Sequence, residues 1–138
     1  MISFNKQAPK DWIKSLNQFG HFKDQLNLSD HIKQLVYEQK WEELDALLMQ
    51  ATAADGVIYQ YMSQFVKFTK MEFIIAVRDA KNEWEEDGIW HDDGSRVMAF
   101  TLSLTIDAEK IEGGVLELRQ RGSTESIKFP KSCSLSAV

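Results

Sequence analysis

The sequence predicts a single α+β domain with a sandwich or jelly-roll core. Helical periodicity is found in residues 1–56, and closely spaced strand-like runs follow in residues 57–130. Helices followed by several strands are typical of an α+β architecture. A length of 138 residues suits one compact domain, and a hydrophobic fraction of 43% is enough to build an ordered core. We therefore expect one domain over 1–138, with a helical part (1–56), a β-rich core (57–130) and an irregular tail (131–138) that is either frayed or an edge strand.

Helices are expected first. A short helix is predicted over 11–16, and Ser29 is a good N-cap for the next helix because its hydroxyl can accept a free backbone N–H. Apolar residues then recur on one helical face: Ile32, Leu35 and Val36, followed by Leu44, Leu47, Leu48 and Ala51. This pattern indicates two helices, or one helix bent near Gln39. Gly56 is expected to close the stretch, as a residue tolerant of positive φ would.

Four strands are expected after Gly56. The predicted ranges, which are rich in β-branched, aromatic and other apolar residues, are 71–78, 97–106, 115–119 and 126–129. The third strand is entered through Gly113-Gly114, and Pro130 stops the fourth. No repeat or linker divides this part of the chain.

Composition narrows the classes of function. The formal net charge is -5, with 21 acidic against 16 basic residues, which argues against nonspecific nucleic-acid binding. Cys133 is the single cysteine, so an intramolecular disulfide and a cysteine-based zinc site are excluded. The N-terminus lacks the apolar run of a signal peptide, and no segment reaches the length of a membrane span. A cytoplasmic protein that does not bind membranes is expected.

The most informative stretch is residues 90–96, Trp-His-Asp-Asp-Gly-Ser-Arg. At the end of a strand, His91 and Asp93 would point the same way, while Asp92 would point the other way. One imidazole and one carboxylate aimed into a common space are two of the three ligands of a 2-His-1-carboxylate iron site. The same residues also fit an ordinary β-hairpin turn, with His91 as the last residue of a strand.

In its context, this motif resembles the front half of an iron(II)- and 2-oxoglutarate-dependent dioxygenase. The resemblance rests on the order of the His-x-Asp motif, the turn with Gly94, the apolar strand after it and the Gly113-Gly114 pair, and it covers about residues 72–129. It implies N-terminal helices packed on a double-stranded β-helix (jelly-roll or cupin-like) core. It further implies His91 and Asp93 as Fe(II) ligands, with 2-oxoglutarate as cosubstrate and O₂ as oxidant.

The family also binds the far carboxylate of 2-oxoglutarate through a basic residue. Arginine can hold a carboxylate through two parallel hydrogen bonds, which makes four arginines candidates for this role. They are Arg78, Arg96, Arg119 and Arg121. No catalytic residue beyond the metal ligands is predicted.

One feature of the family is missing from the sequence. The second histidine of the family's iron site follows the Gly-Gly strand, but no histidine occurs after Gly114. The strand that carries it would lie beyond Val138, so we expect a core that is incomplete at its C-terminus and a chain that ends early. The remaining histidines, His21 and His31, belong to the part predicted to be helical.

Three functions follow from these observations. The first is an Fe(II)/2-oxoglutarate-dependent dioxygenase, or a truncated member of that superfamily, which would hydroxylate a small molecule or a protein side chain. The second is a non-catalytic ligand- or protein-binding domain of the same fold that lacks the distal histidine. The third is an unrelated α+β interaction module in which residues 92–94 are only a turn.

Overall fold

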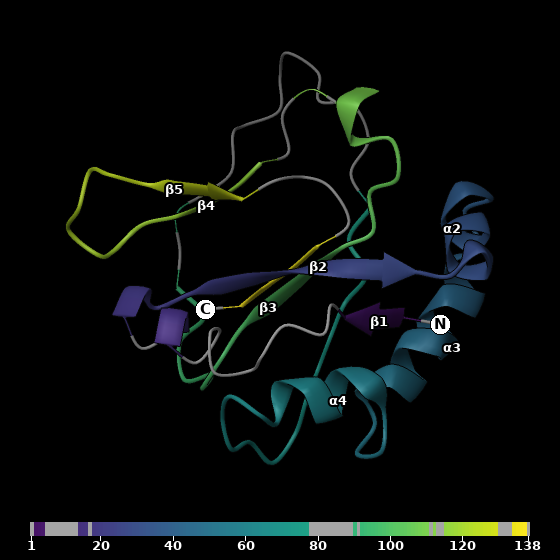
Figure 1. Ribbon diagram of the computed structural model, residues 1–138, viewed down its shortest axis with the longest axis horizontal. Helices are drawn as coiled ribbons and strands as arrows, with labels where there is room; N and C mark the ends of the chain where they lie inside the picture. The colour runs from purple at the N-terminus through teal and green to yellow at the C-terminus, as the bar shows by residue number, and fades with distance from the viewer. Residues whose placement is uncertain are drawn as a thin grey trace.

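The computed structural model describes residues 2–4, 14–16, 18–77, 90, 92–110, 112, 115–129 and 134–137. Its main elements in chain order are β1 (Ile2–Phe4), β2 (Phe22–Leu28), α2 (Asp30–Tyr37), α3 (Trp41–Thr52), α4 (Val57–Met62), β3 (Phe100–Ser103), the 3₁₀-helix η1 (Ala108–Lys110), β4 (Leu116–Leu118), β5 (Ile127–Phe129) and β6 (Ser134–Ala137) (Figure 1). Residues 14–16 are also helical, within the short helix predicted over 11–16. The predicted α+β class is confirmed.

Four strands form an antiparallel sheet in the order β1-β2-β6-β3, and β4 pairs with β5 in a separate hairpin. In the centre of the larger sheet, Leu135 of β6 lies opposite both Asp24 of β2 and Leu102 of β3. The prediction of an irregular tail is therefore wrong for residues 134–137. Small polar residues have little strand propensity of their own, and pairing with β2 and β3 orders them.

The N-terminal part is not purely helical, because β1 and β2 belong to it. Phe22, Asp24 and Leu28 are buried, whereas Lys23 and Asn27 are exposed, which is the alternation of a strand with one buried face. The sequence of β2 contains no β-branched residue, and a carboxylate stands at one of its inward positions. For these reasons the strand was not predicted.

The predicted start of α2 and the predicted break near Gln39 agree with the structure. Ser29 has extended backbone angles, and its Oγ accepts the Ile32 N–H at 3.4 Å, so the predicted N-cap of α2 is confirmed. At the other end, the Lys40 N–H donates to Leu35 O and the Gln39 N–H to Val36 O, the two bonds of a Schellman motif. Gln39 has a positive φ of 57°, so two separate helices form rather than one bent helix.

Gly56 does not close the helical stretch. α3 ends at Thr52, and Gly56, with a φ of -77°, is the N-cap of α4, a helix inside the range predicted to be β-rich. A Cβ at Gly56 would collide with the carbonyl oxygens of Gln50 and Ala51, so close backbone approach explains the glycine. Among the described residues, no helix has the length and apolar character needed to cross a bilayer.

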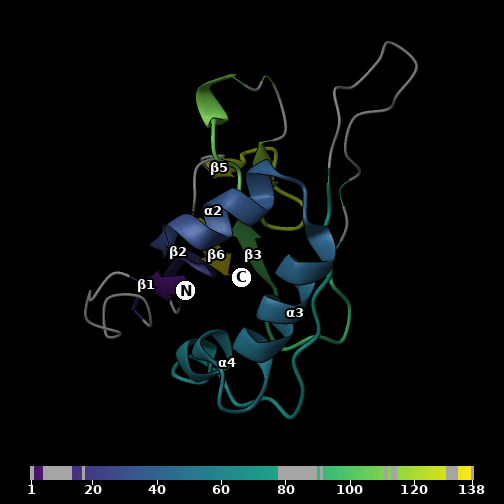
Figure 2. The same ribbon diagram turned by 90° about the vertical axis from the view of Figure 1, so that its right-hand side faces the viewer.

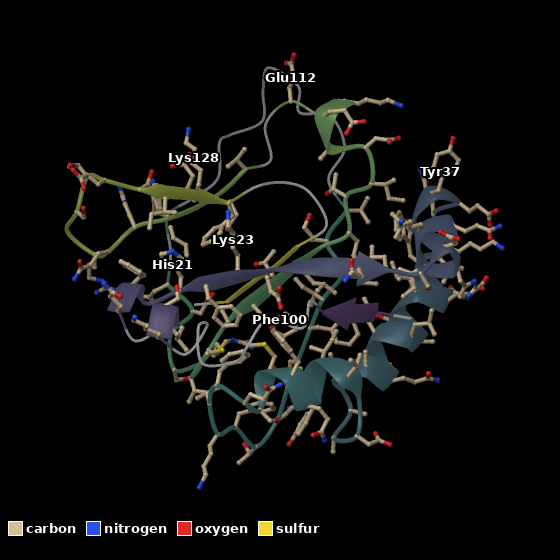
Figure 3. The ribbon with its side chains drawn as sticks, viewed as in Figure 1. His21, Lys23, Tyr37, Phe100, Glu112 and Lys128 are labelled. Atoms are coloured by element: carbon tan, nitrogen blue, oxygen red, sulfur yellow. The ribbon has the colours of Figure 1, made fainter. Side chains whose placement is uncertain are left out.

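The core lies between the larger sheet and the helices. The hairpin β4–β5 lies above the sheet and α4 below it in both views (Figures 1 and 2). Phe100 of β3 projects toward α4 and packs against the core, while Tyr37 points away from α2 into solvent (Figure 3). The buried apolar cluster comprises Phe22, Leu28, Ile32, Leu44, Leu48, Ile58 and Met62.

The predicted strands are formed only in part. β3, β4 and β5 lie within the predicted ranges 97–106, 115–119 and 126–129 but are shorter. The strand predicted over 71–78 is wrong for residues 71–77, which make no backbone hydrogen bond to any other residue that the structure describes. Their side chains still alternate, with Phe73 and Ile75 packed on the core and Ile74 89% exposed. An apolar alternating sequence favours extended backbone, but a strand also needs a partner.

Candidate functional site

The Asp92–Ser95 segment forms a turn that is closed by the side chain of Asp92. Its Oδ1 accepts the Gly94 N–H at 3.1 Å, and Gly94 has a positive φ of 64°. Its Oδ2 accepts from Nη2 of Arg121, which lies in the loop between β4 and β5. Both oxygens of Asp92 are therefore engaged in fixing local structure, as expected for an aspartate at a turn.

Trp90 is held by the same loop. The guanidinium of Arg119, directly after β4, lies 3.9 Å from the centroid of the Trp90 ring, within the range of a cation–π interaction. The indole remains 47% exposed. The β4–β5 loop thus contacts the residues that precede and follow His91 in the sequence.

The predicted metal ligands are described only in part. Asp93 is exposed and lies within the turn of residues 92–95. Its expected position at the end of a strand stays a prediction, because residues 78–89 and 91 lie outside the described part of the chain. His91 lies outside the described residues, as does Arg78, one of the arginines predicted to bind 2-oxoglutarate. Trp90 and Asp92 both contact the β4–β5 loop. That His91 and Asp93 point the same way stays a prediction.

Arg96 is paired elsewhere. Its Nη1 lies 3.7 Å from Oε2 of Glu72, whose other oxygen lies 2.7 Å from Nζ of Lys70. The hydrogen bond and charge of Lys70, with a smaller contribution from Arg96, hold the pKa of Glu72 below its usual value. Because Glu72 carries a negative charge opposite Arg96, Arg96 is a weaker candidate than Arg119 for a cosubstrate carboxylate.

The structure describes two histidines, His21 and His31. Nδ1 of His21 lies 3.1 Å from Phe19 O, and its ring meets Phe129 edge-on at 5.5 Å between centroids. His31 is exposed in the first turn of α2. In the described part of the chain, no group of three His, Cys, Asp or Glu side chains could hold a metal ion.

The contact between the β4–β5 loop and the motif was not predicted. Asp92 and Arg121 are separated by 29 residues, and such a distant ion pair leaves no trace in local periodicity. One regularity is visible in the sequence: Arg119 and Arg121 have the same i, i+2 spacing as Trp90 and Asp92, the two residues that they contact. That regularity has meaning only once the two segments are known to be neighbours.

The donor chemistry of the motif suits iron(II), which binds imidazole and carboxylate groups. The carboxylate of Asp93 is on the surface, and the sequence places an imidazole two residues before it. Among the described residues, no three side chains form a complete set of metal ligands. No family model matches the chain, and neither does any curated protein or any solved structure.

Proposed function

We propose that this chain is a domain of the iron(II)/2-oxoglutarate-dependent dioxygenase type, in which His91 and Asp93 bind the metal. One observation supports the proposal: Asp93, which has the His-x-Asp spacing, lies exposed on the surface next to Trp90 and Asp92, and the guanidinium of Arg119 lies 3.9 Å from the centroid of the Trp90 ring. An aspartate of the motif and an arginine that can hold a carboxylate are thereby brought to the same part of the surface. In this proposal the antiparallel strands belong to a double-stranded β-helix core.

Each component has a defined task in this proposal. Iron(II), together with 2-oxoglutarate and O₂, would supply the hydroxylation of a C–H bond in a small molecule or a protein side chain. His91 and Asp93 would hold the metal, and Arg119 would bind the far carboxylate of 2-oxoglutarate. The planar guanidinium of Arg119 can stack on Trp90 through its face while its N–H groups, in the plane, hold a carboxylate.

Thermal unfolding of the full chain with Mn(II), and then with Mn(II) plus 2-oxoglutarate, tests the proposal. Ligands that bind the folded state raise the melting temperature by mass action. We expect a rise with Mn(II) and a further rise with 2-oxoglutarate. His91→Ala and Asp93→Ala should lose both increments, whereas Arg119→Gln should lose only the second. Mn(II) electron paramagnetic resonance gives the fraction of bound metal independently of activity.

Two matched variants control for nonspecific binding of metal. His31 is an exposed histidine in α2, and Asp107 is an exposed aspartate whose Oδ2 lies 3.6 Å from Nζ of Lys110. His31→Ala and Asp107→Asn should respond as the unmodified chain does. An equal loss in these variants would contradict a specific site.

A different result would favour the alternative function. If the folded chain responds neither to Mn(II) nor to 2-oxoglutarate, the proposal fails. The chain would then be better described as a non-catalytic ligand- or protein-binding domain, or as an interaction module in which residues 92–94 are a turn.

A further inference from the structure

We propose that residues 71–77 form a dimer interface, in which the segment pairs antiparallel with the same segment of a second copy of this chain. These residues make no backbone hydrogen bond to any other residue that the structure describes. A row of unpaired N–H and C=O groups is a template for another strand. The proposal is independent of the proposed function, because it involves neither the metal nor the cosubstrate.

The segment has one packed side and one open side. Phe73 and Ile75 pack on the core, whereas Ile74 is 89% exposed and Ala76 is also exposed. No charged residue and no proline occurs in 73–77. Charges and prolines are the features that protect the sheet edges of monomeric proteins from pairing, so this edge is open to another strand.

The charges near the start of the segment favour a second copy as the occupant. The two carboxylate oxygens of Glu72 lie 2.7 Å from Nζ of Lys70 and 3.7 Å from Nη1 of Arg96. Glu72 is therefore balanced within its own copy and needs no countercharge from a partner. The remaining residues, 73–77, are uncharged, apolar and alternating, which is the chemistry that an added strand needs. One surface can thus serve both copies, as in a two-fold symmetric dimer.

Full overlap of the two segments defines the register. With residue 71 opposite residue 77, Ile74 lies opposite Ile74 of the second copy, and Glu72 lies opposite Ala76. Side chains directly opposite each other contact across a strand pair, so the two Ile74 side chains cover one another. The small Ala76 leaves room for the ion pairs of Glu72. A register centred on residue 72 would instead oppose two Glu72 carboxylates, which is unfavourable.

The first test is sedimentation velocity of the full chain from about 1 µM to about 1 mM, the range of weak affinities that a small interface gives. We expect a monomer at the lowest concentration and a dimer at the highest. Ile74→Lys should stay monomeric throughout, because it places two positive charges opposite each other. Its melting temperature at low concentration should not change, since Ile74 is exposed.

Met49→Lys is the matched control for the added charge. Met49 is 61% exposed and lies on α3, outside the proposed interface. This variant should dimerise as the unmodified chain does. An unmodified chain that is monomeric at every concentration, or an equal loss of the dimer in Met49→Lys, overturns the proposal.

The second test examines the register by disulfide crosslinking in a Cys133→Ser background, because Cys133 is the single cysteine. Ile74→Cys should form an intermolecular disulfide on mild oxidation, since residues opposite each other bring their Cβ atoms within about 4.5–5.5 Å. Ala76→Cys should not, because the two copies of residue 76 are four residues out of register, about 13 Å apart. A missing crosslink in Ile74→Cys, or one that forms as fast in Ala76→Cys, overturns the proposed pairing.

Amide hydrogen exchange distinguishes a second copy from other occupants. Amides of residues 71–77 should exchange rapidly at low concentration, and those that donate to the second copy should become protected at high concentration. Protection that is independent of concentration would mean that the same chain supplies the pairing strand. Protection that appears only when an extended peptide of another sequence is added would mean a different protein partner. Either result overturns the proposal.

Discussion

Tyr61 and Asp24, which are 37 residues apart in the chain, are joined by a side-chain hydrogen bond. Asp24 of β2 is 4% exposed, and its Oδ2 accepts from the hydroxyl of Tyr61 on α4 at 2.7 Å. A buried carboxyl group needs such partners, because its desolvation is costly otherwise. The bond therefore joins the helical layer to the sheet at one defined position.

Removing this hydroxyl should destabilise the protein. We expect Tyr61→Phe to lower the free energy of unfolding by about 1–3 kcal/mol, the usual cost of removing a partner from a buried polar group. Urea denaturation measures the change. Tyr59→Phe is the matched control, since Tyr59 is on the same helix and its ring packs edge-on against Phe68. A loss as large in Tyr59→Phe would contradict the role of the hydrogen bond.

The same pair predicts a dependence of stability on pH. Burial, and then the hydrogen bond and charge of Asp24, raise the pKa of Tyr61 above its usual value. A phenol whose pKa is raised by folding stabilises the protein fully below the unfolded pKa of about 10 and loses that contribution as the pH rises further. The stability difference between the unmodified chain and Tyr61→Phe should therefore shrink between pH 9 and about pH 11. A constant difference would contradict the pKa shift.

At the scale of single elements, helix ends are encoded locally. The Ser29 cap was predicted correctly because the signal is one hydroxyl next to an apolar periodic run, and it needs no information from the rest of the fold. The prediction for Gly56 was wrong because the local sequence does not contain the contacts made by this residue. A glycine was expected to end a helix through positive φ, whereas the close approach of the Gln50 and Ala51 carbonyls requires it.

Ser29→Ala should weaken the start of α2. The Ser29 Oγ to Ile32 N distance of 3.4 Å is long for a hydrogen bond, so we expect a loss near 0.5–1 kcal/mol, at the lower end for N-caps. Thermal and urea unfolding give the value. Ser29→Asp keeps an acceptor and should retain most of the stability. An equal loss in both variants would indicate that another contact of Ser29 matters more than the cap.

The whole molecule depends on pairings between distant segments. β6 lies between β2 and β3, so the last described strand occupies the middle of the sheet. Residues 71–77 have a higher strand propensity than β6, but they pair with no described strand. Strand propensity reports how well a residue fits a pleated surface, and it does not select the partner.

Amide hydrogen exchange should be faster in residues 71–77 than in β6, although residues 71–77 have the higher strand propensity. Backbone amides of residues 71–77 should exchange rapidly, because none donates to a described backbone carbonyl. Amides of β6 that are paired with β2 and β3 should be protected to nearly the global stability. Protection of residues 71–77 as strong as that of β2, or rapid exchange throughout 134–137, would contradict this arrangement.

The sequence by itself determined the α+β class, the Ser29 cap, a helical region with a break near Gln39 and the approximate places of β3, β4 and β5. These features arise from interactions between near neighbours, which periodicity and capping report directly. The sequence also predicted a metal site at the His-x-Asp motif, and this stays a prediction. Only the tertiary structure decided that residues 134–137 are the centre of the sheet, that Asp24 is buried against Tyr61, and that Arg121 engages Asp92. Each of these contacts joins segments far apart in the chain, and its energy depends on burial and geometry that no local pattern contains.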